Sequence, residues 1–363
     1  MRIVYNSFHG RYSDSPRAIY ERLRDRPDLE HVWLADSAHL EAFPADATTV
    51  DVDGPDARGA LEAADLVIAS SHTEVEWDKP AGTTYLQTWH GTPLKRIAFD
   101  VTDIRHADMN YLSRVEQETP NWTFLVSPNR FSTPILQRAF RYGGEMLESG
   151  YPRNDVLFQD DPVKTAELRR RLDLPAGKRV VLYAPTWRDD EFYGQGRYKM
   201  SMQLDLAAAR RSLGDDHVLL VRRHPNVVDP IPDDGSGFAR DVSTYPDMAD
   251  LLSITDVLIT DYSSVMFDFA NTGRPILLFT YDLEHYRDKL RGFYFDFERE
   301  APGPLLMTSE DVIRSLAEIA VDKSAYEDER KAFQKRFCDL DDGHATRRVV
   351  DRMLELGESL RSE

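Results

Sequence analysis

The chain has 363 residues, of which 41% are apolar and 30% charged, and a formal net charge of −18. One hydrophobic core seldom serves a chain of this length, so we expect two domains with a cleft between them. The acidic balance argues against a general nucleic-acid binder, which needs a basic face, and the single cysteine, Cys338, excludes an internal disulfide and a cysteine-built metal site.

The sequence carries no sign of a targeting or membrane-spanning segment. No apolar run approaches the roughly 20 residues needed to cross a bilayer, and the first residues form a strand-like run without the apolar stretch of a signal peptide. We therefore expect a cytoplasmic protein. No polybasic segment provides membrane binding by charge alone, and peripheral contact with the inner face of the cell membrane is left open.

Short apolar runs alternate with helical patterns in the first part of the chain, which is typical of a parallel α/β sheet. Ser15 and Pro16 mark the start of the first helix, because serine can cap a helix and proline fits its first turn. The predicted strands are residues 2–5, 31–35, 65–70, 84–88 and 123–127.

A second series of the same kind follows a helix predicted at residues 163–172. Its predicted strands are residues 180–183, 218–222, 257–260 and 276–280, and the pattern is helical from residue 307 onward. The stretches 194–199 and 228–237 are predicted as loops because of their glycine, proline and aspartate content.

Two Rossmann-like halves followed by C-terminal helices are the plan of many nucleotide-sugar transferases. We assign residues 1–155 to an N-terminal acceptor domain and residues 156–340 to a C-terminal donor domain. Residues 341–363 form a final helix, for which packing back on the N-terminal domain is one option.

His90 is the first candidate for chemistry. It follows a predicted strand and precedes Gly91, so its imidazole is expected at the carboxyl end of a strand, where open α/β sheets bind ligands. Histidine is the side chain best suited to accept a proton near neutral pH. A hydrogen-bonded structural histidine beside Trp89 would give the same pattern, but the following Gly-Thr-Pro turn and Lys95 favour a functional role.

A cationic strand end forms the second candidate. Arg222, Arg223 and His224 end an apolar strand, and Pro225 makes the chain leave the sheet there. Guanidinium groups offer phosphate a fixed fork of donors. Taken alone, a strand end with solvated arginines is the simpler interpretation.

The third candidate is a helix start. The strand 257–260 runs into Asp261, Ser263 and Ser264, and one of the two serines is expected to cap the helix that follows. A helix start offers unpaired N–H groups and a positive dipole end, which suit a phosphate. A plain cap, with Asp261 complementing the dipole, is the alternative.

Two weaker segments follow strands on the same edge of their sheets. His9, after the first strand, could contact an acceptor, and Thr186 and Arg188, after a strand of the second series, could contact a donor. No glycine-rich dinucleotide fingerprint or phosphate-loop lysine is present, which argues against a dehydrogenase or a nucleoside triphosphatase. The histidines lack metal-ligand spacing, so no metal site is predicted.

Six motifs, in the right order and over most of the chain, resemble the CDP-glycerol glycerophosphotransferase family, the teichoic acid primases and polymerases of bacterial cell-wall assembly. They are residues 89–95 (Trp-His-Gly-Thr-Pro-Leu-Lys), 150–155 (Gly-Tyr-Pro-Arg-Asn-Asp), 184–188 (Ala-Pro-Thr-Trp-Arg), 222–225 (Arg-Arg-His-Pro), 260–264 (Thr-Asp-Tyr-Ser-Ser) and 342–345 (Asp-Gly-His-Ala).

The resemblance implies a GT-B-like fold of two Rossmann-type domains with parallel sheets and C-terminal helices. It implies transfer of an alditol phosphate, with glycerol phosphate favoured, from a CDP-alditol to an acceptor hydroxyl, with CMP as the leaving group. The family's catalytic histidine matches His90, its histidine associated with the donor phosphates matches His224, and Ser263 and Ser264 match pyrophosphate contacts. No cofactor or metal is implied, since CDP-glycerol or CDP-ribitol is a substrate.

Our hypothesis is that His90 takes the proton from the acceptor hydroxyl while a cationic cradle holds the diphosphate. The acceptor is expected in teichoic acid-like wall or capsule synthesis, lipid-linked or polymeric, with single and repeated addition both open. The residues expected to be catalytic are His90 and His224, and those expected to bind substrate are Arg222, Arg223, Ser263, Ser264, Thr186, Arg188, Asp261, His9 and Lys95.

Two other functions are kept as alternatives. A GT-B glycosyltransferase using a nucleotide-sugar would share the two-domain plan but commonly relies on carboxylates. A non-catalytic binder of anionic polymers would use the same basic strand end and leave His90 without a role.

Overall fold

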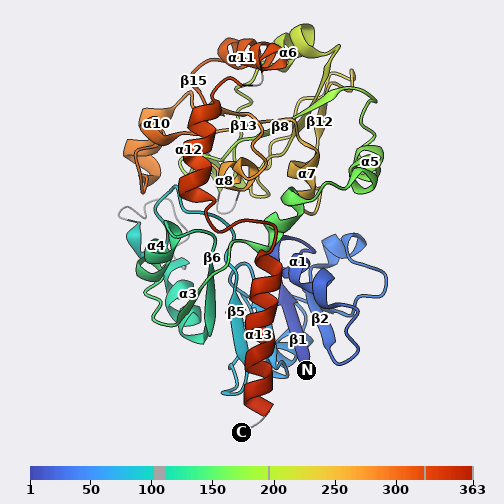
Figure 1. The fold of residues 1–363 in the computed structure, drawn as a ribbon, viewed down its shortest axis with the longest axis vertical. Coiled ribbons are helices and arrows are strands. Elements are labelled where there is room, and N and C mark those ends of the chain that lie inside the picture. Colours follow the sequence, from blue (N-terminus) through green and yellow to red (C-terminus); the bar gives the residue numbers. More distant parts are fainter. Residues whose placement is uncertain (102–110, 195–196, 323, 362–363) are drawn as a thin grey trace.

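The structure, a computed structural model, describes residues 1–101, 111–194, 197–322 and 324–361. Two sheets flanked by helices lie one above the other along the long axis of the molecule (Figure 1). All strands within each of these two sheets run parallel. The prediction of an α/β protein with two parallel sheets is therefore confirmed.

The first sheet, the lower one in Figure 1, has the strand order β3-β2-β1-β4-β5-β6-β7 over the described residues. Its central strands are apolar runs buried along their whole length, as expected for a parallel sheet that is covered on both faces. The strands are β1 (Arg2–Asn6), β2 (Glu30–Ala35), β3 (Thr49–Asp51), β4 (Leu66–Ala69), β5 (Thr84–Gln87), β6 (Phe124–Ser127) and β7 (Glu145–Glu148).

The second sheet has the order β12-β11-β8-β13-β14-β15 in the part of the chain that is described. Its middle strand β8 is flanked by β11 and β13, so the loops that follow these three strands lie side by side. The strands are β8 (Arg179–Ala184), β11 (His217–Val221), β12 (Ala239–Asp241), β13 (Val257–Thr260), β14 (Ile276–Phe279) and β15 (Leu305–Leu306).

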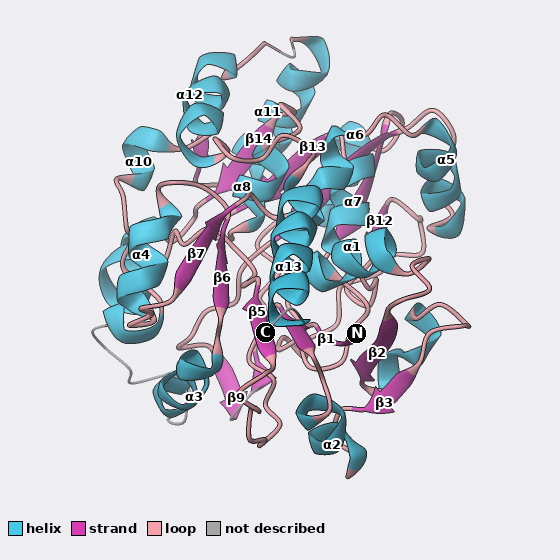
Figure 2. Ribbon diagram, turned by 60° about the horizontal axis from the view of Figure 1, so that its bottom comes forward, coloured by secondary structure: helices cyan, strands magenta, loops and turns pink. Residues whose placement is uncertain are grey.

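Helices pack on both faces of each sheet and complete the apolar cores (Figure 2). The α-helices are α1 (Asp14–Leu23), α2 (Asp56–Glu62), α3 (Tyr111–Glu118), α4 (Ser132–Ala139), α5 (Pro162–Arg171), α6 (Leu206–Leu213), α7 (Met248–Ile254), α8 (Val265–Ala270), α9 (Leu283–His285), α10 (Phe297–Glu300), α11 (Ser309–Val321), α12 (Glu327–Phe337) and α13 (Ala345–Arg361). Shorter turns are η1 (Ser37–Ala42), η2 (Ala98–Asp100), η3 (Thr119–Asn121), η4 (Pro152–Phe158) and the π-helical η5 (Tyr286–Arg291).

The last helix, α13, returns to the first sheet after α12 has packed on the second (Figure 1). Val349, Val350 and Met353 of α13 are buried in the same core as Ile3 of β1 and Ile19 of α1. The chain therefore crosses between the two sheets twice, once at η4 and once between α12 and α13.

Two local predictions differ from the structure. The first helix begins at Asp14, with Ser13 rather than Ser15 at the cap position. Within the stretch predicted as a loop at residues 194–199, residues 195–196 lie outside the described residues, and the residues around them pair as a short antiparallel hairpin of β9 (Phe192–Gly194) and β10 (Arg197–Tyr198).

Candidate active site

A cleft of about 940 Å³ lies between the two sheets. This volume falls within the roughly 300–1,000 Å³ range of small-molecule sites. The first domain contributes the loop after β5, with His90 and Lys95, and the second contributes the loops after β8, β11 and β13. The residues from those three loops include Thr186, Trp187, Arg222, Arg223, His224, Ser263 and Ser264.

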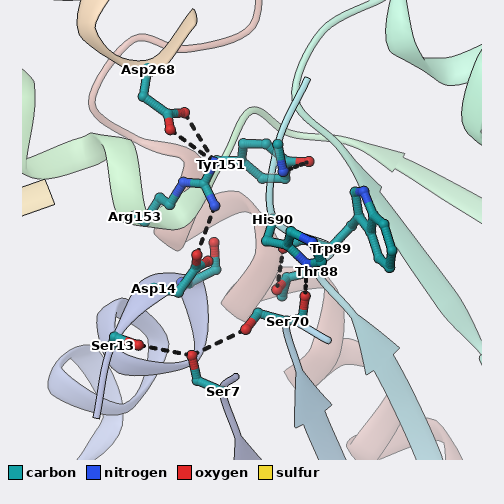
Figure 3. A network of polar contacts seen from close by, with 12 residues as sticks. Ser7, Ser13, Asp14, Ser70, Thr88, Trp89, His90, Tyr151, Arg153 and Asp268 are labelled. Atoms are coloured by element: carbon teal, nitrogen blue, oxygen red, sulfur yellow. Dashed lines mark hydrogen bonds and ion pairs between the residues drawn. The ribbon is translucent and has the colours of Figure 1, made fainter. Parts of the chain in front are cut away.

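His90 is held by a backbone carbonyl of the neighbouring strand end. Its Nδ1–H donates to the Ser70 carbonyl oxygen at 2.6 Å (Figure 3). The neutral ring therefore keeps a free lone pair on Nε2. Burial lowers the pKa of His90 to about 4, so the ring is neutral near pH 7 and can accept a proton.

His224 carries its proton on the opposite ring nitrogen. The backbone N–H of Asn226 donates to His224 Nδ1 at 3.2 Å, so the neutral ring has its hydrogen on Nε2. The ring packs on Trp187 with centroids 3.9 Å apart. Burial, helped by the positive charges of Lys95 and Arg11, lowers the pKa of His224 to about 3. His224 is thus a neutral hydrogen-bond donor in the cleft.

The cationic residues of the cleft are fixed by the backbone around them. Arg222 donates to the Tyr245 carbonyl at 2.7 Å, and Arg223 to the Val227 carbonyl at 2.9 Å. Burial lowers the pKa of Arg222 to about 10, which leaves it charged at neutral pH. Lys95 Nζ lies 5.5 Å from the centre of the Trp187 ring. All three side chains present positive charge to one cleft, as phosphate binding requires.

The start of α8 completes the rear wall of the cleft. Ser264 occupies the cap position without a side-chain capping bond, while Ser263 Oγ accepts from the Val265 N–H at 3.3 Å. Thr186 donates through both its N–H and its hydroxyl to Asp261 Oδ1, at 2.9 and 2.7 Å. The loops after β8 and β13 are therefore tied together beside the serines.

Arg188 and Asp261, which are expected from the sequence to bind substrate, are not among the residues that line the cleft. Arg188 is 3% exposed and donates to Asp261 Oδ2 at 3.0 Å and to Asp282 Oδ2 at 2.6 Å. Its donors also reach the Thr186 carbonyl. Both residues are engaged by neighbouring protein groups and hold the Thr186 loop in place.

His9 also lies outside the lining of the cleft. Its ring lies 3.1 Å from Asp53 and 3.6 Å from Glu74. The left-handed backbone at Phe8 and His9 turns this segment away from the strand direction. The positive charge from this loop that acts on His224 belongs instead to Arg11.

The motif at residues 150–155 joins the two domains behind His90. Arg153 donates to Asp14 at 2.7 Å and to Asp268 of α8 at 2.9 Å, and the Tyr151 hydroxyl accepts from the Gly91 N–H at 3.1 Å (Figure 3). The Arg153 guanidinium is thereby shared between carboxylates from both domains. This network fixes His90 relative to the wall of the cleft that the second domain contributes.

Sequence reasoning missed the groups that set the two proton positions. The Ser70 carbonyl and the Asn226 N–H are backbone atoms, whose partners no side-chain motif reveals. Trp187, which packs on His224, stands inside one of the motifs and could have been noticed. His72 also lines the cleft but belongs to none of the motifs.

The described residues contain no group of three or more His, Cys, Asp or Glu side chains placed to hold a metal ion. Over the same ranges, no helix combines the length and the apolar character needed to cross a membrane.

Comparisons with known proteins agree on one family. A family model described as CDP-Glycerol:Poly(glycerophosphate) glycerophosphotransferase matches residues 1–355. The teichoic acid poly(glycerol phosphate) polymerase of Bacillus subtilis (strain 168) is 42% identical over 97% of this chain and 48% of its own length. The teichoic acid glycerol-phosphate transferase of Staphylococcus aureus (strain NCTC 8325 / PS 47) is 40% identical over 97% of this chain and 92% of its own length. The chain thus spans about half of the first relative and nearly all of the second.

Solved structures agree as well. The wall teichoic acid polymerase TagF, whose fold is GT-B-like, matches with a TM-score of 0.90 at 37% identity over 99% of this chain and 89% of that chain. A TagF variant soaked with CDPG matches with a TM-score of 0.90 at 36% identity, over 99% of this chain and 89% of that chain. The UDP-GlcNAc 2-epimerase of Neisseria meningitidis, at 12% identity and a TM-score of 0.56 over 98% of this chain and 100% of that chain, shares the fold alone.

Proposed function

Because this chain belongs to the CDP-glycerol:poly(glycerophosphate) glycerophosphotransferase family, we propose that it transfers glycerol phosphate from CDP-glycerol to an acceptor hydroxyl and releases CMP. The observation that carries the proposal is the pair of histidines in the cleft. His90 offers a bare Nε2 and His224 offers an Nε2–H, both in neutral rings.

The two histidines suit the two ends of a phosphoryl transfer. The acceptor oxygen forms a bond to the phosphorus that carries glycerol, and its proton passes to His90 Nε2. The bond between that phosphorus and the bridging oxygen of CMP breaks, and the electron pair stays on CMP. Charge builds up on the phosphate oxygens during this step, and fixed donors on the other side of the cleft stabilise it.

The donor side provides those fixed groups. Arg222 and Arg223 are held by backbone carbonyls, so their charges are oriented before substrate arrives. His224 Nε2–H, Ser263 and Ser264 add neutral donors along the same wall. Such preorganised groups cost little reorganisation during the reaction.

The acceptor in this proposal is a hydroxyl at the end of a lipid-linked or polymeric chain of a teichoic acid-like wall polymer. The names of the relatives, which include polymerases and a glycerol-phosphate transferase, support that class of acceptor. The reaction is proposed at the inner face of the cell membrane. A polymerase and a primase for ribitol phosphate are also among the relatives, so CDP-ribitol is the second donor to test.

The test identifies the products. The protein is incubated with CDP-glycerol or CDP-ribitol and a synthetic glycerol phosphate oligomer, CMP is quantified by chromatography, and the new bond is identified by ³¹P NMR. We expect CMP and a phosphodiester in equal amounts, with CDP-glycerol the better donor. Release of CDP with a new glycosidic bond from a nucleotide-sugar, or donor binding without turnover, would contradict the proposal.

A further inference from the structure

The cleft extends beyond His90 into a lobe formed by the first domain. Ser71, His72 and Glu74, after β4, and Tyr111 and Arg114, in α3, line this front lobe. The residues proposed to bind the donor come mostly from the second domain. The front lobe is therefore the part of the cleft that is left for the acceptor beside His90.

His72 lines this lobe and carries a polar atom that has no partner among the described residues. The residue is 8% exposed, and its Nε2 is buried without a hydrogen-bond partner among the described residues. The ring is fixed by aromatic neighbours, stacking on Trp122 at 6.1 Å and meeting Trp89 edge-on at 6.0 Å between centroids. Buried polar atoms are normally paired, so an unpaired one at a binding cleft calls for a ligand.

Glu118 sets which nitrogen of His72 faces the ligand. Its carboxylate lies 3.1 Å from His72 Nδ1 and also accepts from the Tyr85 hydroxyl at 2.5 Å and the Thr73 N–H at 3.2 Å. A carboxylate in contact with these donors accepts from Nδ1–H as well. The unpaired nitrogen of the neutral ring is then Nε2, with its lone pair free to accept a hydroxyl proton.

His72 lies close to His90, the proposed base. Ser70, whose carbonyl holds His90, is two residues before His72, and the Trp89 ring is a neighbour of both rings, at 6.0 Å from His72 and 4.2 Å from His90.

We propose that His72 binds the hydroxyl-bearing end of the acceptor, so that Nε2 accepts a hydrogen bond from one hydroxyl of the terminal alditol while another faces His90. This inference rests on the proposed function and adds an acceptor-binding residue to it. Glu118 is a positioning residue, because it acts only through His72.

The test separates acceptor from donor binding in the full chain. In His72→Asn, the amide can keep the hydrogen bond to Glu118 but has no group in place of Nε2. In His72→Gln, the amide can reach the position of Nε2. We expect His72→Asn to raise the KM for a glycerol phosphate dimer about 3- to 10-fold, the effect of one neutral hydrogen bond. The donor Kd should stay unchanged, and His72→Gln should recover part of the loss.

Several outcomes would overturn the proposal. An unchanged acceptor KM in His72→Asn, or an equal change in acceptor KM and donor Kd, would indicate a structural role. If the variants do not fold, the side-chain ¹⁵N signal of His72 Nε2 in the wild type is followed while the dimer is added, and a signal that stays constant at saturation rejects the contact. Wild-type protein that releases no CMP would reject the proposed function itself, and this outcome is distinct from the others.

Discussion

Gly91 lies where the first domain touches the start of α8, and its replacement tests how closely the two halves of the site must approach. A Cβ atom on Gly91 would lie 2.6 Å from Ser264 Oγ and 2.9 Å from Ser264 Cβ, whereas ordinary contact begins at 3.4 Å. Gly91→Ala must therefore move the His90 loop or Ser264 by about 0.8 Å. A misplacement of about 1 Å can cost on the order of 100-fold in rate, so we expect roughly 10- to 100-fold slower turnover.

The assay is the kcat for CMP release, with the melting temperature as a check on folding. Gly91 does not adopt a positive φ angle, so alanine is compatible with its own backbone and the effect arises from the contact. Gly59→Ala in α2 is the matched control, because a Cβ atom there meets nothing within 4 Å. This control should keep wild-type turnover.

A double variant identifies the contact. Ser264→Gly removes both atoms that a Cβ on Gly91 would meet. We therefore expect Gly91→Ala combined with Ser264→Gly to turn over about as fast as Ser264→Gly alone. Wild-type turnover in Gly91→Ala, or no recovery in the double variant, would refute the idea that this approach positions the site.

Three further predictions address the proton positions, the buried ion pair and the junction between the domains. In the side-chain ¹⁵N spectrum at pH 7, we expect His90 to be protonated on Nδ1 only and His224 on Nε2 only, and a charged ring at either position would contradict the assignment. Arg188→Met leaves Asp261 and Asp282 without their buried partner and should lower the free energy of unfolding in urea by about 3–5 kcal/mol, whereas the exposed control Arg130→Met should change it by less than about 1 kcal/mol. If Arg188→Met kept the stability of the wild type but bound the donor more weakly, a direct contact between Arg188 and the substrate would be indicated. Asp341 accepts from the Tyr151 N–H at the junction between the domains, at 2.9 Å. Burial raises the pKa of Asp341 from 3.8 to about 7, so between these pH values the folded state keeps a proton that the unfolded state loses, and the stability gained from that proton disappears as the pH rises through 7. The stability of Asp341→Asn relative to the wild type should therefore rise by up to about 1.4 kcal/mol per pH unit between pH 5 and 7, and parallel pH curves would exclude the shift.

The strands that the sequence pattern revealed are the inner strands of both sheets. Among the described strands of these two sheets, the four that it missed, β3, β7, β12 and β15, are the outer ones. They have two to four residues and are partly exposed, so they carry no continuous apolar run. These strands form because they pair with an adjacent strand of the sheet. The pattern of a single sequence does not show which segments will become adjacent.

The sequence also indicates only part of the lining of the candidate site. His90 and His224 each follow an inner strand, and the carboxyl ends of the two sheets bring both to one cleft. Arg188 fits the same pattern but meets Asp282, which is 94 positions further along the chain. A motif shows which residues follow a strand, but it does not show which of them are paired with a carboxylate in the folded protein. The domain boundary near residue 155 and the independence from metal stay predictions.

The role of His90 as the base is tested most directly by the single-turnover rate of CMP release in His90→Asn saturated with CDP-glycerol and acceptor. The asparagine amide can replace Nδ1–H as the donor to the Ser70 carbonyl, but it cannot take up the proton. We expect a rate lower by about 10²- to 10⁴-fold, the usual contribution of a general base, with the Kd for CDP-glycerol unchanged. A rate near that of the wild type, with donor still bound, would contradict it.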